Sequence, residues 1–161
     1  MTTKADYTPE EWGRLLQAPA YVGFYVIMAD PNLRRMIKEL RALSKALERQ
    51  PAPEDAQELV NSLVDEIREK SEGMKKLPGT EELSQGTPEE IRARILDTLR
   101  SIGPLLERKA NPEEVAGFKE WLLSLALVVA EASKKGGLLG IGGVRVSEKE
   151  KMALADLDDV L

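Results

Sequence analysis

Hydrophobic side chains recur at helical spacing along most of the chain. In three segments the apolar positions lie three or four residues apart. This spacing places them on one face of an α-helix, so each segment is predicted to be an amphipathic helix with one buried side. The stripes are Leu33, Met36, Ile37, Leu40, Leu43 and Leu47; then Ala56, Leu59, Val60, Leu63, Val64, Ile67 and Met74; then Ile91, Ile95, Leu96, Leu99 and Ile102.

Two other segments are apolar on almost every side. They contain the runs "APAYVGFYVIMA" and "WLLSLALVVA". A helix without a polar face belongs at the centre of a bundle. Both runs are shorter than the roughly 20 residues that cross a bilayer, so no transmembrane segment is expected. We therefore place Ala18–Ala29 and Val115–Ala132 at the centre of the fold.

Capping motifs mark where the helices begin. Thr8, Thr87 and Asn111 each precede Pro-Glu-Glu, and Ser147 precedes Glu-Lys-Glu. Ser, Thr or Asn can accept from a free N–H of the first turn, proline fits the first helical position, and glutamate favours the positive end. Each motif predicts a helix start.

Prolines and glycines indicate where helices stop or bend. We expect Pro19 to interrupt the first helix and Gly103-Pro104 to bend or end the one that starts after Thr87. These signals predict a single all-α domain over residues 1–161, a bundle of about six helices. A Gly-rich loop or a tiny β-hairpin precedes the last helix.

A faint internal repeat is present. Both "EWGRLLQAPAYVGFYVIMADPN" and "EWLLSLALVVAEASKKGG" begin Glu-Trp, continue through Leu-Leu into an apolar helix, and end at a break. Two helix–break–helix units packed around the two apolar helices would bury both. Chance recurrence of Trp in two amphipathic helices explains the pattern equally well.

The composition narrows the chemistry. The chain has no cysteine and no histidine, which excludes disulfides, thiolate catalysis, zinc–thiolate sites and imidazole acid–base chemistry. The net charge of −5 gives no general reason to expect nucleic acid. Lack of cysteine fits a reducing compartment, and the first residues contain no apolar leader, so we expect a cytoplasmic protein.

The segment "KKGGLLGIGGVRVSEKEK" holds five of the twelve glycines. In the first interpretation, it ends one helix, reverses the chain tightly and starts the next helix, so it is only a connector. Alternatively, residues 134–146 form a small-anion or ligand site that uses Lys134, Lys135 and Arg145. The segment lacks both the dinucleotide pattern G-x-G-x-x-G and a Walker loop, which favours the connector.

Positive charge is concentrated on the helix predicted from Leu33. Its basic residues recur at helical spacing, and the following helix is rich in acids. Charge pairing along an antiparallel hairpin of these two helices is the preferred interpretation. The alternative is a partner face that meets an acidic protein. The basic residues are Arg34, Lys38, Arg41, Lys45 and Arg49; the acids are Glu54, Asp55, Glu58, Asp65, Glu66, Glu69 and Glu72.

The C-terminal "ADLDDVL" offers Asp156, Asp158 and Asp159 as possible cation ligands. A calcium site needs six to eight oxygens, usually around a glycine-bearing loop, and that pattern is missing. We therefore expect solvated acids here and predict no metal site. Tyr21, Phe24 and Tyr25 are expected in the core.

The stretches "WGRLLQAPAYVGFYVIMADP" and "GFKEWLLSLALVVAEASKKGGLLGIGGVRVSEKEKMALADL" resemble a group of small prokaryotic all-helical proteins. More remotely, the second resembles the helix–loop–helix of tellurite-resistance-type helical domains. The Ser147–Glu150 start fits that pattern, whereas Lys134 and Lys135 stand where the family has an acidic loop residue. The resemblance implies an all-helical fold, and no metal ligand is carried over from it.

These observations predict a non-enzymatic interaction or structural protein without a cofactor. Its expected partner is a second copy of itself or an acidic protein. One alternative is a small-anion or ligand-binding protein using residues 134–146. A second is a carboxylate-dependent enzyme or a metal-binding helical protein, although no catalytic residue stands out.

Overall fold

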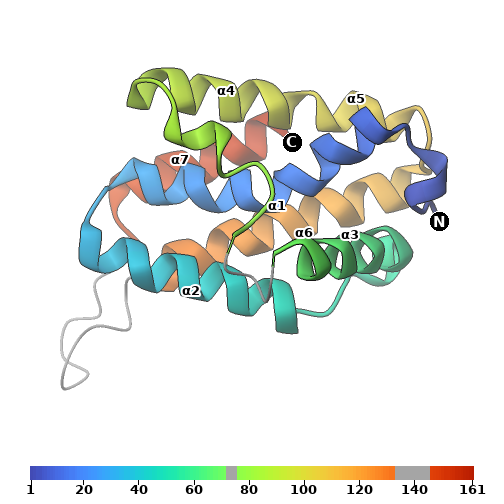
Figure 1. Ribbon diagram of the computed structural model, residues 1–161, viewed down its shortest axis with the longest axis horizontal. Helices are drawn as coiled ribbons and strands as arrows, with labels where there is room; N and C mark the ends of the chain where they lie inside the picture. Colours follow the sequence, from blue (N-terminus) through green and yellow to red (C-terminus); the bar gives the residue numbers. More distant parts are fainter. Residues whose placement is uncertain (72–75, 133–145) are drawn as a thin grey trace.

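The computed structural model describes residues 1–71, 76–132 and 146–161, and every regular element within these ranges is helical (Figure 1). Six helices have 13 residues or more, and a shorter one, α5, follows α4. This confirms the predicted all-α bundle. The helices are α1 (Pro9–Ala29), α2 (Leu33–Arg49), α3 (Gln57–Lys70), α4 (Pro88–Arg100), α5 (Ile102–Glu107), α6 (Pro112–Ala132) and α7 (Glu148–Val160); single 3-10 turns are η1 (Lys4–Asp6), η2 (Glu54–Ala56) and η3 (Glu82–Ser84).

Helices α1 and α6 pack against each other at the centre, as their apolar sequences predict (Figure 1). Leu15 and Val22 of α1 are fully buried, as are Phe118, Leu125 and Val129 of α6. Removing apolar surface from water stabilises the fold by roughly 25 cal/mol per Å². This central pair is therefore the main source of hydrophobic stabilisation.

The remaining helices cover the central pair, and two of them pack chiefly on the central helix that is not their neighbour in the chain. Helix α2 follows α1 in the chain and packs chiefly on α6, while α7 follows α6 and packs chiefly on α1. Helix α4 also packs on α1. Two helix–break–helix units packed around each other, as the repeated sequence pattern suggests, would give this exchange of partners.

The predicted helix starts are confirmed. The hydroxyl groups of Thr8, Thr87 and Ser147 each accept a hydrogen bond from a backbone N–H of the first turn at 3.2 Å, and the glutamate at that position accepts from the backbone of the capping residue in return. The side chain of Asn111 accepts from the Glu114 N–H at 2.8 Å. These contacts satisfy donors that have no partner within the helix.

The predicted break at Pro19 is wrong, because α1 runs unbroken from Pro9 to Ala29. Proline removes one backbone hydrogen bond and costs a helix about 3 kcal/mol. Here Pro19 itself is buried, and packing on several sides of α1 outweighs that local cost. The break at Gly103-Pro104 is confirmed in position, because α4 ends at Arg100 and Pro104 lies in the first turn of α5.

Two details of the predicted apolar stripes are wrong. Ile37 is 48% exposed, because it lies about 120° around α2 from the buried Leu43 and so falls at the edge of the stripe. The third helix is shorter than expected: η2 precedes it and α3 ends at Lys70. Met74, together with the Gly-rich loop or hairpin at 134–145, lies outside the described residues.

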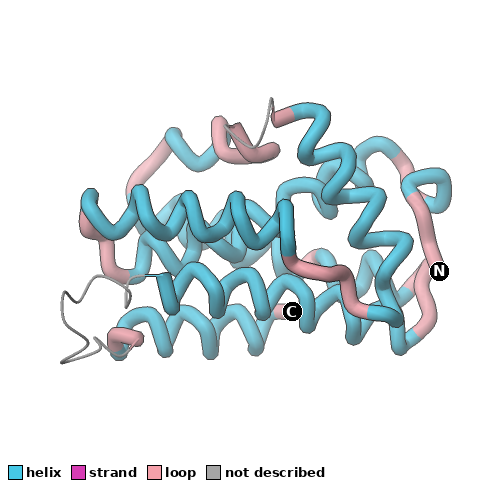
Figure 2. Tube along the Cα trace, turned by 90° about the horizontal axis from the view of Figure 1, so that it is seen from below, coloured by secondary structure: helices cyan, strands magenta, loops and turns pink. Residues whose placement is uncertain are grey.

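The predicted charge pairing between α2 and α3 is also wrong, as far as the described residues show. No ion pair joins these helices, and the strongest contacts of α2 are with α6. Figures 1 and 2 show why: after the connection at 50–53, α3 turns across the end of the bundle and does not return along α2. The buried face of α3, which includes Leu59 and Leu63, decides this direction.

The close approach of α1 and α2 requires a glycine. A Cβ added to Gly23 would lie 2.5 Å from Cδ2 of Leu43, whose side chain is fully buried and would have to shift. We predict that Gly23→Ala lowers the free energy of unfolding by about 1–3 kcal/mol through overpacking. Chemical denaturation monitored by circular dichroism measures the change.

Gly13 provides the matched control on the same helix. No atom lies within 4 Å of a Cβ at this position, so Gly13→Ala should stabilise the protein by roughly 0.5–1 kcal/mol through helix propensity. Equal stabilisation by both substitutions would contradict the proposed α1–α2 contact.

Candidate functional site

The outer side of α2 carries a row of cations, which we call the basic face: Arg34, Lys38, Arg41, Lys45 and Arg49. All five side chains are exposed. They occupy one side of the helix because successive members are three or four residues apart. The opposite side buries Leu43 and Leu47. The structure therefore brings together the residues that the sequence suggested as a partner face.

The basic face has no acidic partners within the described residues. None of the ion pairs there includes one of its members; the sixth cation of α2, Arg35, binds Asp30 at 3.1 Å. Some cations of other helices are paired locally. Arg14 binds Glu10 and Arg100 binds Asp97, each about one turn away on its own helix.

The arrangement of the basic face opposes helix stability. Arg34, Lys38, Arg41, Lys45 and Arg49 have each other as neighbours at three or four residues, and like charges at that spacing destabilise a helix by roughly 0.2–0.5 kcal/mol per pair. Arg34 also lies in the first turn, next to the positive end of the helix. Arg49 lies in the last turn, next to the negative end of the helix, where a cation is favourable. For the rest of the row, the like-charge spacing is a cost to the monomer.

Grooves flank the basic face on both sides. Between α2 and α6 lies a groove of about 750 Å³. Ala42, Ala46 and Val128 supply apolar surface there, while Lys38 and Arg49 reach the same groove. A hydrogen bond from Gln50 Nε2 to Ser124 Oγ joins the two helices beside it.

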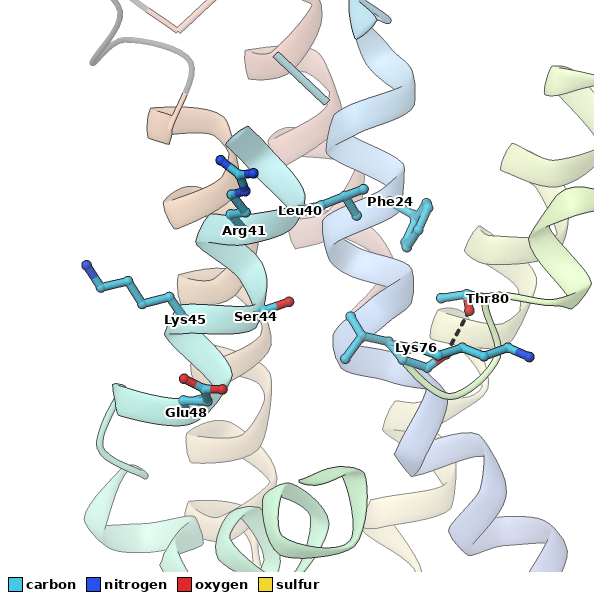
Figure 3. Close-up of a pocket in the computed structure, with 9 residues that line it drawn as sticks. Phe24, Leu40, Arg41, Ser44, Lys45, Glu48, Lys76 and Thr80 are labelled. Atoms are coloured by element: carbon cyan, nitrogen blue, oxygen red, sulfur yellow. Dashed lines mark hydrogen bonds between the residues drawn. The ribbon is translucent and has the colours of Figure 1, made fainter. Parts of the chain in front are cut away.

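The second hollow, of about 390 Å³, lies between α2, α1 and the segment near Leu77. Leu40 of α2 and Phe24 of α1 both line it, and Figure 3 shows Arg41 and Lys45 extending outward from α2. The row of cations is thus bordered on each side by partly apolar surface. An acidic partner with apolar side chains could contact both kinds of surface together.

A buried carboxyl group lies on the inner side of α2. Glu39 is only 2% exposed and faces Glu150, which is also 2% exposed and caps α7 through the Ser147 N–H. Burial, and next the negative charge of Glu150, raise the pKa of Glu39 to about 7; Arg35 opposes this rise and Asp30 adds to it. The sequence contained a signal, because Glu39 falls within the apolar stripe.

This carboxyl group predicts a pH-dependent stability. The folded-state pKa of Glu39 lies above its ordinary value of 4.5, so the folded state favours the protonated form. The stability present at low pH is lost as the pH rises from about 4.5 to about 7. Glu39→Gln should therefore raise the free energy of unfolding at pH 8 by on the order of 1–3 kcal/mol and leave pH 4.5 nearly unchanged.

Thermal unfolding at several pH values measures this effect, with Glu48→Gln, an exposed acid on the same helix, as the control. A Glu39→Gln variant that is less stable than wild type at pH 8 would show that the ionised carboxylate has a stabilising partner.

The other site candidates from the sequence are the cations of the glycine-rich segment and the C-terminal acids. Lys134, Lys135 and Arg145 lie outside the described residues. Asp156 accepts a hydrogen bond from the Tyr25 hydroxyl at 2.7 Å, and Arg92 donates to the same hydroxyl at 3.3 Å. In the described ranges, no group of three or more carboxylates is placed to hold a metal ion.

The predicted aromatic core is confirmed for Tyr21 and Tyr25, which are buried, while the half-buried Phe24 lines the hollow beside α2. The two grooves were not predicted. Their walls come from α1, α2, α6 and the Leu77 segment, which are distant in sequence, and no local pattern indicates that they meet.

Comparisons with protein-family models, curated proteins and solved structures find no match to this chain. Of the helices in the described ranges, none combines the length and the apolar character needed to cross a membrane. The function must therefore be argued from the chemistry of the surface itself.

Proposed function

We propose that the protein is a non-enzymatic interaction protein that binds an acidic protein surface through the basic face of α2. The observation that carries the proposal is a row of five exposed cations without acidic partners in the described structure. Because their spacing opposes helix formation, an external anionic surface is the simplest reason for their presence.

The dimensions of the basic face suit a protein partner. From Arg34 to Arg49 the row extends about 22 Å along a rigid helix, which is the length of a partner helix of about four turns. Carboxylates spaced along such a helix could meet successive cations. The bordering apolar surface of Ala42, Val128 and Leu40 offers contacts for the partner's non-polar side chains.

Nucleic acid is less well suited to this surface. The whole chain has a net charge of −5, so a long phosphate backbone would be repelled by the molecule beyond α2. A protein partner can instead confine its negative charge to the contact. Such complementarity mainly increases the association rate and the specificity.

The test is binding of poly-L-glutamate, measured by fluorescence anisotropy at 50 mM NaCl. We predict that the triple variant Lys38→Glu, Arg41→Glu, Lys45→Glu weakens binding about tenfold or more. Each exposed pair contributes only about 0.2–1 kcal/mol, but three attractive contacts become repulsive.

The control reverses three exposed cations elsewhere: Arg100→Glu, Lys149→Glu and Lys151→Glu. This variant has the same net charge as the α2 variant and should keep most of the binding. Equal loss in both variants would mean that only the overall charge matters, and the proposal would fail.

A further inference from the structure

We infer that the acidic surface recognised by α2 belongs to a second copy of this chain. The acidic face, which we define as Glu54, Asp55, Glu58, Asp65 and Glu69 on η2 and α3, docks on the basic face of the partner copy. This inference rests on the proposed function of the basic face and names its partner.

The acidic face is as exposed as the basic face. All five of its side chains are exposed, and Glu58, Asp65 and Glu69 share one side of α3 with the half-buried Ser62 between them. Among residues 1–71, 76–132 and 146–161, its one ion pair joins Asp65 to Arg68 at 3.1 Å on the same helix. Negative charge therefore remains available along about three turns.

The neighbouring Glu66 shows which acid of α3 the monomer does use. Its carboxylate accepts from Trp12 Nε1 at 2.6 Å and binds Lys4 at 2.9 Å and Lys70 at 2.7 Å. Burial alone would raise the pKa of Glu66, but these hydrogen bonds lower it to about 2. The monomer thus fixes one acid of α3 firmly in place and leaves the outer acids to solvent.

The two faces of one copy do not neutralise each other. Helix α3 crosses the end of the bundle after residues 50–53, and no ion pair joins it to α2 within the described chain. Both helices nevertheless lie along the lower side of the molecule in Figure 1, and both are in view from below in Figure 2. The two helices that carry the basic face and the acidic face are therefore neighbours on one side of the molecule.

Two-fold symmetry can satisfy both faces at once. When two copies meet through this side, the basic face of each lies against the acidic face of the other, so every contact forms twice and the assembly closes as a dimer. The small side chain of Ala42, in the groove beside the basic face, allows close approach of the opposing α3.

Salt dependence distinguishes this contact from general attraction. Two copies with a net charge of −5 repel each other, and added salt screens that repulsion. Association that weakens as salt is added must therefore come from complementary faces. Exposed ion pairs are individually weak, so the dimer is expected to form at micromolar or higher concentration.

Sedimentation equilibrium of the full chain at 10–200 µM tests the inference. We expect a monomer–dimer equilibrium at 50 mM NaCl and at least about tenfold weaker association at 500 mM. Two charge-reversal variants should each be monomeric: Lys38→Glu, Arg41→Glu, Lys45→Glu on α2, and Glu58→Lys, Asp65→Lys, Glu69→Lys on α3.

Mixing the two variants gives the decisive result. In the mixture, the α2 made acidic in one variant faces the α3 made basic in the other. The unchanged acidic α3 of the first variant likewise faces the unchanged basic α2 of the second. A 1:1 mixture should therefore form a heterodimer although neither variant associates alone, which also shows that both variants are folded.

Two results would overturn the inference. One is a wild-type protein that stays monomeric at 200 µM and 50 mM NaCl while it still binds poly-L-glutamate through α2; the proposed function would then stand with a different partner. The other is a dimer that the reversals do not affect. A wild-type protein that neither dimerises nor binds polyglutamate through α2 would refute the proposed function as well.

Discussion

The packing of α1 against α6 is the contact on which the rest of the structure depends. Both helices are apolar on more than one side, and neither can expose those sides to water at reasonable cost. Their fully buried residues include Leu15, Val22, Leu125 and Val129. Covering this pair is the requirement that the other helices meet, and it explains why an interrupting proline is tolerated within α1.

The covering helices are constrained only on their inner sides. Helix α2 contacts α6 through one stripe and approaches α1 closely at Gly23, where the side chain of Leu43 occupies the space that a Cβ would need. Its outer side is free to carry any residues that solvent accepts. A row of cations on that side with no ion pair among the described residues is therefore informative, because packing does not require it and the like-charge spacing along most of the row opposes it.

Local chemistry predicted the helix starts well, because a capping residue and its glutamate form their contacts within four residues. Thr87 and Ser147 are clear cases. Tertiary packing decided what the sequence pattern could not. The break at Pro19 was predicted from the local cost of a proline, which does not show that packing around α1 outweighs it. A hairpin of α2 and α3 was predicted because helical periodicity does not encode the direction of a connection.

The candidate site was predicted only in part, because local spacing fixes some of it and tertiary packing fixes the rest. Lys38, Arg41 and Lys45 share a face because of their spacing, so the basic face follows from the sequence alone. The grooves beside it depend on Phe24, Leu77 and Val128, which are brought there by tertiary packing. Glu39 could have been identified from its place in an apolar stripe, but the proximity of Glu150 could not.

Native-state hydrogen exchange tests the central role of the α1–α6 pair most directly. The account predicts that amides of residues 15–27 and 122–129 exchange only through global unfolding, with a free energy equal to that from chemical denaturation, while amides of α2 and α7 open at lower free energy. Exchange of the α1 or α6 amides at a lower free energy than those of α2 would contradict it.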